Sequence, residues 1–83
     1  MQVRFFADLR SITGCAEADV PYAETAGALI RSLCGIYGEK LEEKFNEEII
    51  VLINGQHMNR LGGYNAPLKP EDRVDIFPVV TGG

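Results

Sequence analysis

The chain has 83 residues, of which 46% are hydrophobic and 24% are charged, and its formal net charge is −4. This length allows one domain with a single small core. The eight Lys and Arg residues are dispersed and outnumbered by twelve Asp and Glu residues, which argues against a nucleic-acid-binding protein. The longest apolar run, residues 49–53, is too short to cross a membrane, and the first residues lack the pattern of a signal peptide. We therefore expect a cytoplasmic protein that binds neither nucleic acid nor membrane.

The N-terminal residues predict a two-stranded hairpin. In the first strand, Val3 and Phe5 alternate with polar or outward positions, so they should face the core while Phe6 faces the opposite side. Residues 7–14 are polar with spaced aliphatic side chains and end on a glycine, which is typical of a hairpin connection. Residues 15–20 are then expected to form the second strand.

A helix is predicted after Thr25, whose hydroxyl can cap the first helical turn. Apolar residues recur from there at helical spacing and should form one stripe that faces a core, namely Ala26, Leu29, Ile30, Leu33, Cys34 and Tyr37. Gly38 is well placed to end this helix. The charged residues 39–46 predict either a further helical turn or a loop that Leu41 and Phe45 hold in place.

The next segment predicts a strand and a tight turn. Residues 49–53 are apolar at every position and rich in β-branched side chains, as in a strand that is covered on both faces. Asn54-Gly55 follows directly and favours a two-residue hairpin turn, with residues 56–58 as a short return strand. Residues 60–70 are loop-like, with Leu68 as the expected anchor.

A final strand is predicted from the alternation of Val74 and Ile76 with Asp75 and Phe77. Pro78 should end it, because proline has no N–H to donate to a ladder. The order of elements is strand, strand, helix, strand, short strand, strand. It predicts an α+β fold, a ubiquitin-like β-grasp in which a mixed sheet of four to five strands packs on one main helix. The first and last strands should be neighbours in the middle of that sheet.

We expect a single domain over residues 1–83, with a globular body (1–77) and a mobile tail (78–83) that ends in Gly82 and Gly83. Terminal glycines bury nothing and cost much conformational entropy, so their use would lie in being thin and flexible. Six extended residues can reach on the order of 20 Å. The Gly83 carboxylate is therefore a candidate reactive group on a tether.

Other potentially reactive residues are interpreted as structural. Gly62-Gly63 mimics the end of a protein modifier, but cleavage there would remove the final strand, so we interpret it as a loop turn. Cys34 should be a small buried residue and Cys15 partly exposed, without a disulfide in a reducing cytoplasm. His57 is interpreted as an ordinary surface residue. Since no catalytic set or phosphate-binding loop is present, we expect neither catalysis by this chain alone nor a bound cofactor or metal.

A docking face is predicted at the root of the tail. Phe6 and Phe77 both fall on strand faces opposite the core, so adjacent strands would bring them together as an exposed apolar patch of the kind that marks an interface. The alternative is that a loop covers both rings. The residues expected to contact a partner are Phe6, His57, Met58, Phe77, Pro78, Val80 and Thr81.

Four segments together resemble MoaD, the small sulfur-carrier subunit of molybdopterin synthase. They are Val3-Arg4-Phe5-Phe6-Ala7-Asp8-Leu9-Arg10, Ile53-Asn54-Gly55, Leu68-Lys69-Pro70-Glu71-Asp72-Arg73-Val74 with Phe77-Pro78, and Thr81-Gly82-Gly83. Two positions depart from that pattern: Val79 stands where a second proline is usual, and Glu71 where a glycine is frequent. The related sulfur carrier ThiS, which serves thiazole synthesis, shares the fold and the glycine ending.

The resemblance implies a non-catalytic sulfur carrier with three kinds of partner. Gly83 would be adenylated with ATP by a MoeB-like E1 enzyme and would then receive sulfur from a donor protein as a thiocarboxylate. Gly82 would keep the tail thin enough to enter a MoaE-like large subunit, where sulfur is added to a pterin precursor of the molybdenum or tungsten cofactor. The alternatives are a ThiS-like carrier, a ubiquitin-like modifier conjugated through Gly83, and a plain interaction domain.

Overall fold

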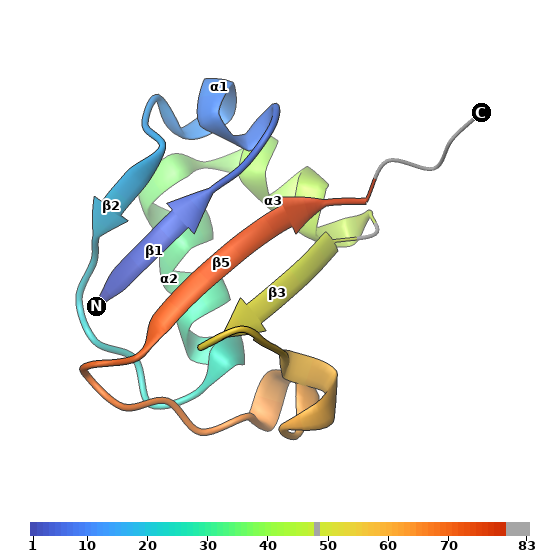
Figure 1. The fold of residues 1–83 in the computed structure, drawn as a ribbon. Coiled ribbons are helices and arrows are strands. Elements are labelled where there is room, and N and C mark those ends of the chain that lie inside the picture. The colour runs from blue at the N-terminus through green and yellow to red at the C-terminus, as the bar shows by residue number, and fades with distance from the viewer. Residues whose placement is uncertain (48, 80–83) are drawn as a thin grey trace.

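The computed structural model describes residues 1–47 and 49–79 (Figure 1). The elements in chain order are β1 (Gln2–Phe5), α1 (Leu9–Thr13), β2 (Glu17–Asp19), α2 (Ala26–Tyr37), α3 (Glu39–Asn46), β3 (Ile49–Ile53), β4 (Gln56–His57), the 3₁₀ turns η1 (Met58–Arg60) and η2 (Gly63–Asn65), and β5 (Arg73–Pro78). Five strands form one sheet in the order β2-β1-β5-β3-β4. β1 and β5 are parallel, and the other neighbours are antiparallel. This is the predicted α+β ubiquitin-like β-grasp, with the first and last strands at its centre.

The core lies between the sheet and α2, which crosses behind it in Figure 1. Thr25 caps α2 as predicted, since its hydroxyl accepts a hydrogen bond from the Ala28 N–H at 3.2 Å. Gly38 ends the helix with a φ of 89°, a backbone conformation that glycine adopts readily. The buried side chains that α2 and the three central strands contribute are Val3, Phe5, Ala26, Leu29, Ile30, Leu33, Val51, Ile53, Val74 and Ile76.

Two connections contain more regular structure than the sequence predicts. Residues 7–14 join β1 to β2 but include the short helix α1, because Leu9 is fully buried and draws the segment onto the core. Residues 60–70 include η2 and bury Ala66 completely as well as Leu68, so Leu68 is not the sole anchor. Residues 39–46 form helix α3, so the helical alternative is correct and the loop is not. Leu41 of this helix is fully buried.

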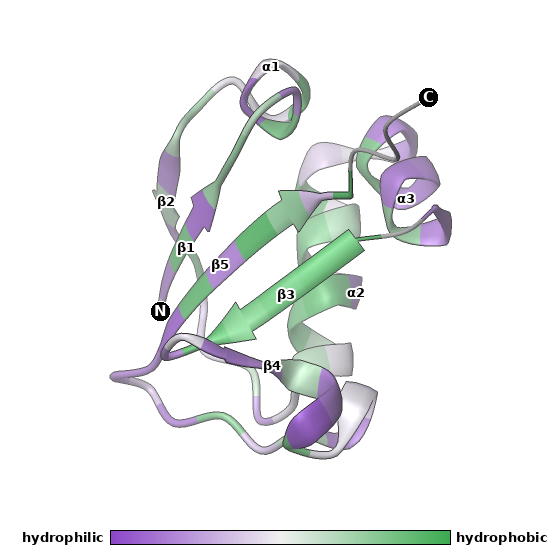
Figure 2. Ribbon diagram, turned by 45° about the vertical axis from the view of Figure 1, so that its right-hand side comes forward, coloured by the Kyte–Doolittle hydropathy of each residue, from purple (hydrophilic) through white to green (hydrophobic). Residues whose placement is uncertain are grey.

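β3 is not covered on both faces, contrary to the prediction. Val51 and Ile53 are buried on the side that α2 covers, whereas Ile50 and Leu52 are only half-buried on the other side. Figure 2 shows β3 hydrophobic along its whole length, and no helix within residues 1–47 and 49–79 crosses its second face. In this chain the continuous apolar run of β3 therefore belongs to a strand whose second side is apolar but is not covered by a helix.

β5 continues one residue beyond the predicted end of the body. Pro78 is the last residue of the strand and lies opposite Ile49 of β3. Proline is tolerated there because the ladder ends at that point. The predictions for Val80, Thr81, Gly82 and Gly83, and for a mobile tail, fall outside the described residues. None of the described helices is long and apolar enough to cross a membrane.

Gly27 lets α2 pack closely against η2. A Cβ at this position would lie 2.9 Å from the backbone oxygen of Tyr64. Gly27→Ala should therefore lower the free energy of unfolding by about 1–3 kcal/mol through overpacking, although alanine is the better helix former. Urea unfolding of the variant would measure this loss.

Gly35→Ala is the matched control on the same helix. A Cβ there meets nothing within 4 Å, so helix propensity alone should raise the free energy of unfolding, by up to about 1 kcal/mol. Equal effects of the two substitutions would contradict a close contact at Gly27.

Candidate docking site on the open sheet face

The two phenylalanines near the end of β5 stack on each other, as the sequence predicts. Phe5 lies beside Ile76 in the parallel register, and the Phe6 N–H donates to the Ile76 carbonyl at 3.2 Å, which brings Phe6 next to Phe77. The ring centroids are 4.2 Å apart and the planes differ by 12°. Both side chains are half-buried. The rings therefore form a partly exposed aromatic patch one residue before Pro78.

Two arginines flank the aromatic pair. The guanidinium carbons of Arg4 and Arg10 lie 5.6 Å and 5.7 Å from the centroid of the Phe6 ring, within the range of cation–π attraction. The Arg10 Nε also donates to the Phe5 carbonyl at 3.1 Å. These contacts place two guanidinium groups against the Phe6 ring, so the aromatic patch has a basic edge.

An ion pair lies next to the aromatic patch. Arg4 faces Asp75 in the parallel register, and its Nε and Nη2 atoms donate to the two carboxylate oxygens at 2.7 Å and 2.9 Å. The Asp75 side chain is 11% exposed and that of Arg4 is 39% exposed. The hydrogen bond to Asp75 is the main cause that raises the pKa of Arg4 above its ordinary value.

The pairing of Arg4 with Asp75 is not among the contacts that the sequence predicts. One signal was available, since Arg4 and Asp75 each precede a phenylalanine of the patch by two residues and therefore share its face. Their partnership depends on the parallel register of β1 and β5. We define the open face as seven residues of the central strands and β4 on the side away from α2, next to which Glu17 of β2 lies opposite Arg4: Arg4, Phe6, Ile50, Leu52, His57, Asp75 and Phe77.

His57 lies on this face and Met58 does not. His57 lies opposite Leu52, and its Nδ1 accepts a hydrogen bond from the Asn59 N–H at 3.1 Å, which caps η1. Met58 is 7% exposed and belongs to the hydrophobic core, so the prediction that it flanks the docking patch is wrong. The chain turns into η1 directly after β4, and this turn points the methionine inward.

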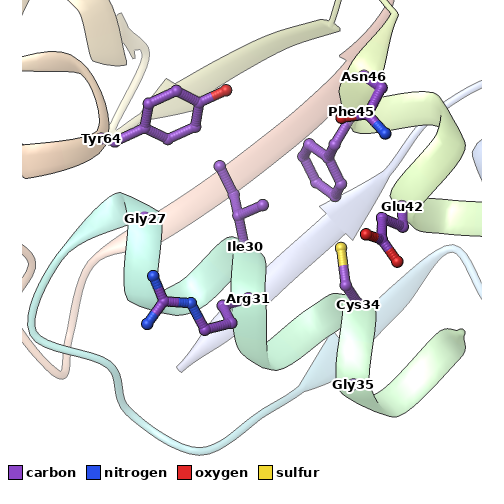
Figure 3. Close-up of a pocket in the computed structure, with 9 residues that line it drawn as sticks. All are labelled: Gly27, Ile30, Arg31, Cys34, Gly35, Glu42, Phe45, Asn46 and Tyr64. Atoms are coloured by element: carbon purple, nitrogen blue, oxygen red, sulfur yellow. The ribbon is translucent and has the colours of Figure 1, made fainter. Parts of the chain in front are cut away.

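A groove of about 530 Å³ lies on the helical side of the molecule, away from the open face. Figure 3 shows Ile30 and Phe45 lining it, with the thiol of Cys34 close to Glu42. Burial, and secondarily the charge of Glu42, raise the pKa of the Cys34 thiol, which makes it a poor nucleophile at neutral pH. Both cysteines are free, and each is partly exposed. The thiol in this groove is therefore less ionised than an ordinary cysteine.

Side chains that could bind a metal ion do not gather in the described part of the chain. Across residues 1–47 and 49–79 no three His, Cys, Asp or Glu side chains could hold a metal ion together. The loop at Gly62 and Gly63 is a turn with φ values of 119° and 64°, as predicted, and it leads into Ala66 and Leu68 of the core.

A match over nearly the whole length of the chain shows its family. Residues 3–83 match the pattern of the ThiS family. The chain belongs to the ThiS family. This family groups small ubiquitin-like sulfur carriers of the ThiS and MoaD type, which in general are not enzymes by themselves. No curated protein matches the chain significantly.

Solved structures share the fold. The small archaeal modifier protein 1 from Methanosarcina acetivorans is 28% identical, with a TM-score of 0.81 over 99% of this chain and 94% of that chain. A chain of the Amycolatopsis orientalis BexX/CysO complex is 25% identical, with a TM-score of 0.83 over 99% and 98%. A Pyrococcus furiosus protein described as molybdopterin converting factor, subunit 1, is 24% identical and has the same fold, with a TM-score of 0.75 over 95% of both chains.

Proposed function

We propose that this chain is a sulfur carrier whose Gly83 carboxylate is adenylated and then converted to a thiocarboxylate, which supplies sulfur for the dithiolene of molybdopterin. The observation that carries the proposal is the stacked pair of Phe6 and Phe77 on the open face, at the end of the strand that leads to the glycines. The family match, which extends to residue 83, supports a role for the ending Thr81-Gly82-Gly83.

A carboxylate must be activated before it can exchange oxygen for sulfur. In the proposed sequence the Gly83 carboxylate attacks the α-phosphorus of ATP, and pyrophosphate leaves. Sulfide then attacks the carbonyl of the acyl-adenylate, and AMP leaves with its electron pair, so one C–O bond is replaced by a C–S bond. A protein persulfide can deliver the same sulfur if a thiol afterwards reduces the acyl disulfide. The thiocarboxylate that results is the nucleophile that passes sulfur on.

In this proposal the carrier contributes a docking surface and an extended C-terminal segment, and its partners contribute the catalytic groups. Residues 78–83 can extend on the order of 20 Å from the aromatic patch, which suffices to enter a neighbouring active site. Stacked aromatic side chains near the centre of an interface commonly act as hot spots. A MoeB-like adenylating enzyme and a MoaE-like large subunit would bind the open face one after the other. A sulfur donor would react with the activated C-terminus.

The opening Val3–Arg10 and the pair Phe77-Pro78 favour the molybdopterin pathway over thiazole synthesis. Co-purification of the chain with a MoaE-like subunit rather than a thiazole synthase would distinguish the two pathways directly.

Incubation with ATP, an E1-like adenylating enzyme from the same organism and a sulfide source should replace one oxygen of Gly83 with sulfur. Intact-mass spectrometry would detect this exchange, and fragmentation would place it at the last residue. A chain without Gly83 is the control. An unchanged mass, or the same change in the shortened chain, would overturn the proposal.

Phe77→Ala should weaken binding of the adenylating enzyme, because it removes half of the stacked pair. A hot-spot truncation of about 2 kcal/mol corresponds to a roughly 30-fold rise in the KM for the carrier. ATP–pyrophosphate exchange would measure it. Tyr64→Ala, which truncates a 59%-exposed aromatic residue of η2, should leave the KM unchanged.

A protein modifier is the second candidate. The 28% identity with the small archaeal modifier protein 1 favours it, and the same adenylation would serve both functions. Tryptic digests of cells that produce the chain should then contain lysines joined through their side-chain nitrogen to residues 74–83, because Arg73 is the last tryptic site. Detection of the thiocarboxylate without such lysines would exclude the modifier function and support the carrier function.

A further inference from the structure

We propose that two copies of this chain associate weakly through their open faces, as a dimer whose twofold axis runs between β1 and β5. This inference goes beyond the proposed function, because it concerns the chain without any other protein. The face fits a second copy because each feature at its centre, the ion pair of Arg4 with Asp75 and the stack of Phe6 on Phe77, is its own complement after half a turn.

The register of the two central strands provides this self-complementarity. Arg4 of β1 lies beside Asp75 of β5, and two residues further along both strands Phe6 lies beside Phe77. A twofold axis in the interface, parallel to both strands and midway between them, sets β1 of one copy against β5 of the other. Arg4 then faces Asp75 of the second copy, and Phe6 faces Phe77 of the second copy.

The ion pair has hydrogen-bonding capacity left for this contact. The Arg4 guanidinium carries five N–H groups, of which two bond to Asp75, and the side chain is 39% exposed. Each carboxylate oxygen can accept a further hydrogen bond. Sheets that pack face to face lie about 10 Å apart, a gap that two facing side chains can bridge. Two arginines and two carboxylates would therefore form one closed cluster, whereas an apolar partner would remove their water without replacement.

The charges around the open face are balanced, unlike those of the whole chain. The chain has eight basic and twelve acidic residues, so two copies repel each other over most of their surface. Three positive and three negative side chains lie on or beside the open face: Arg4, Arg10, Arg73, Glu17, Glu71 and Asp75. Such a face does not repel its own copy and gives no advantage to a strongly acidic or basic partner. Glu17 lies on β2, one strand outside the central pair, and would stay at the hydrated rim.

The size of the face predicts a weak dimer. Five strands spaced about 4.8 Å apart and up to about 17 Å long cover at most on the order of 400 Å² in each copy. Specific interfaces of standard size bury about twice that area on each partner. We therefore expect a monomer in dilute solution and a dimer only at high concentration. A protein that docks on the open face would compete with the second copy.

Sedimentation equilibrium of the full-length chain without any other protein tests the dimer. Between about 10 μM and about 1 mM the mean mass should rise from that of one chain toward that of two. A mass that stays at one chain over this range would overturn the inference.

Reversal of single charges tests the predicted contact. Arg4→Asp or Asp75→Arg alone puts like charges against each other across the axis, so either variant should raise the dissociation constant at least about tenfold. An equimolar mixture of the two variants should associate again, because a face with two carboxylates then meets a face with two guanidinium groups. Arg31→Asp is the matched control: it reverses an exposed arginine in the groove on the helical side and should leave the dimer unchanged.

A dimer that persists in both single variants, or a mixture that fails to associate although both variants are folded, would overturn the inference. Thermal unfolding shows whether they are folded. If either variant is not, concentration-dependent amide chemical shifts of the wild-type chain decide: changes confined to β1, β5 and their neighbours on the open face support the dimer, and changes elsewhere overturn it. The proposed function fails separately, since conversion of Gly83 to a thiocarboxylate is measured with the adenylating enzyme and does not depend on the dimer.

Discussion

The parallel pairing of β1 with β5 is the constraint on which the rest of the structure depends. It joins residues 71 positions apart in the sequence and places them at the centre of the sheet. On one side of this pairing Phe5 and Ile76 enter the core beneath α2, and on the other Phe6 meets Phe77. One register therefore produces both the core and the docking face, so a shift by one residue would destroy both.

The open face shows how a small domain can keep apolar surface available for a partner. α2 buries one side of the sheet, and the second side of β3 retains Ile50 and Leu52 in a half-buried state. The stack of Phe6 on Phe77 covers part of each ring, which limits the apolar area that water contacts. Arg4 and Asp75 then interrupt the apolar surface with a charged pair. Such a surface favours a specific partner over unspecific association.

Much of the fold and part of the site could be predicted from the sequence because the signals are local. The cap at Thr25, the apolar stripe of α2 and the turn at Asn54-Gly55 depend on spacings of a few residues. The inward direction of Met58 was missed because it depends on the path of the chain after β4. The helix α1 was missed because its formation depends on the burial of Leu9 against distant residues.

The sequence by itself determined which residues share a strand face, since alternation is a property of the backbone, and it determined the glycine ending. Phe6 and Phe77 could thus be assigned to one face without coordinates. Only the tertiary structure decided that Arg4 engages Asp75 through two hydrogen bonds and that the second side of β3 stays open. The reason is physical: a register between distant strands, and the layer that covers a sheet, arise from packing of the whole chain, which no local pattern specifies.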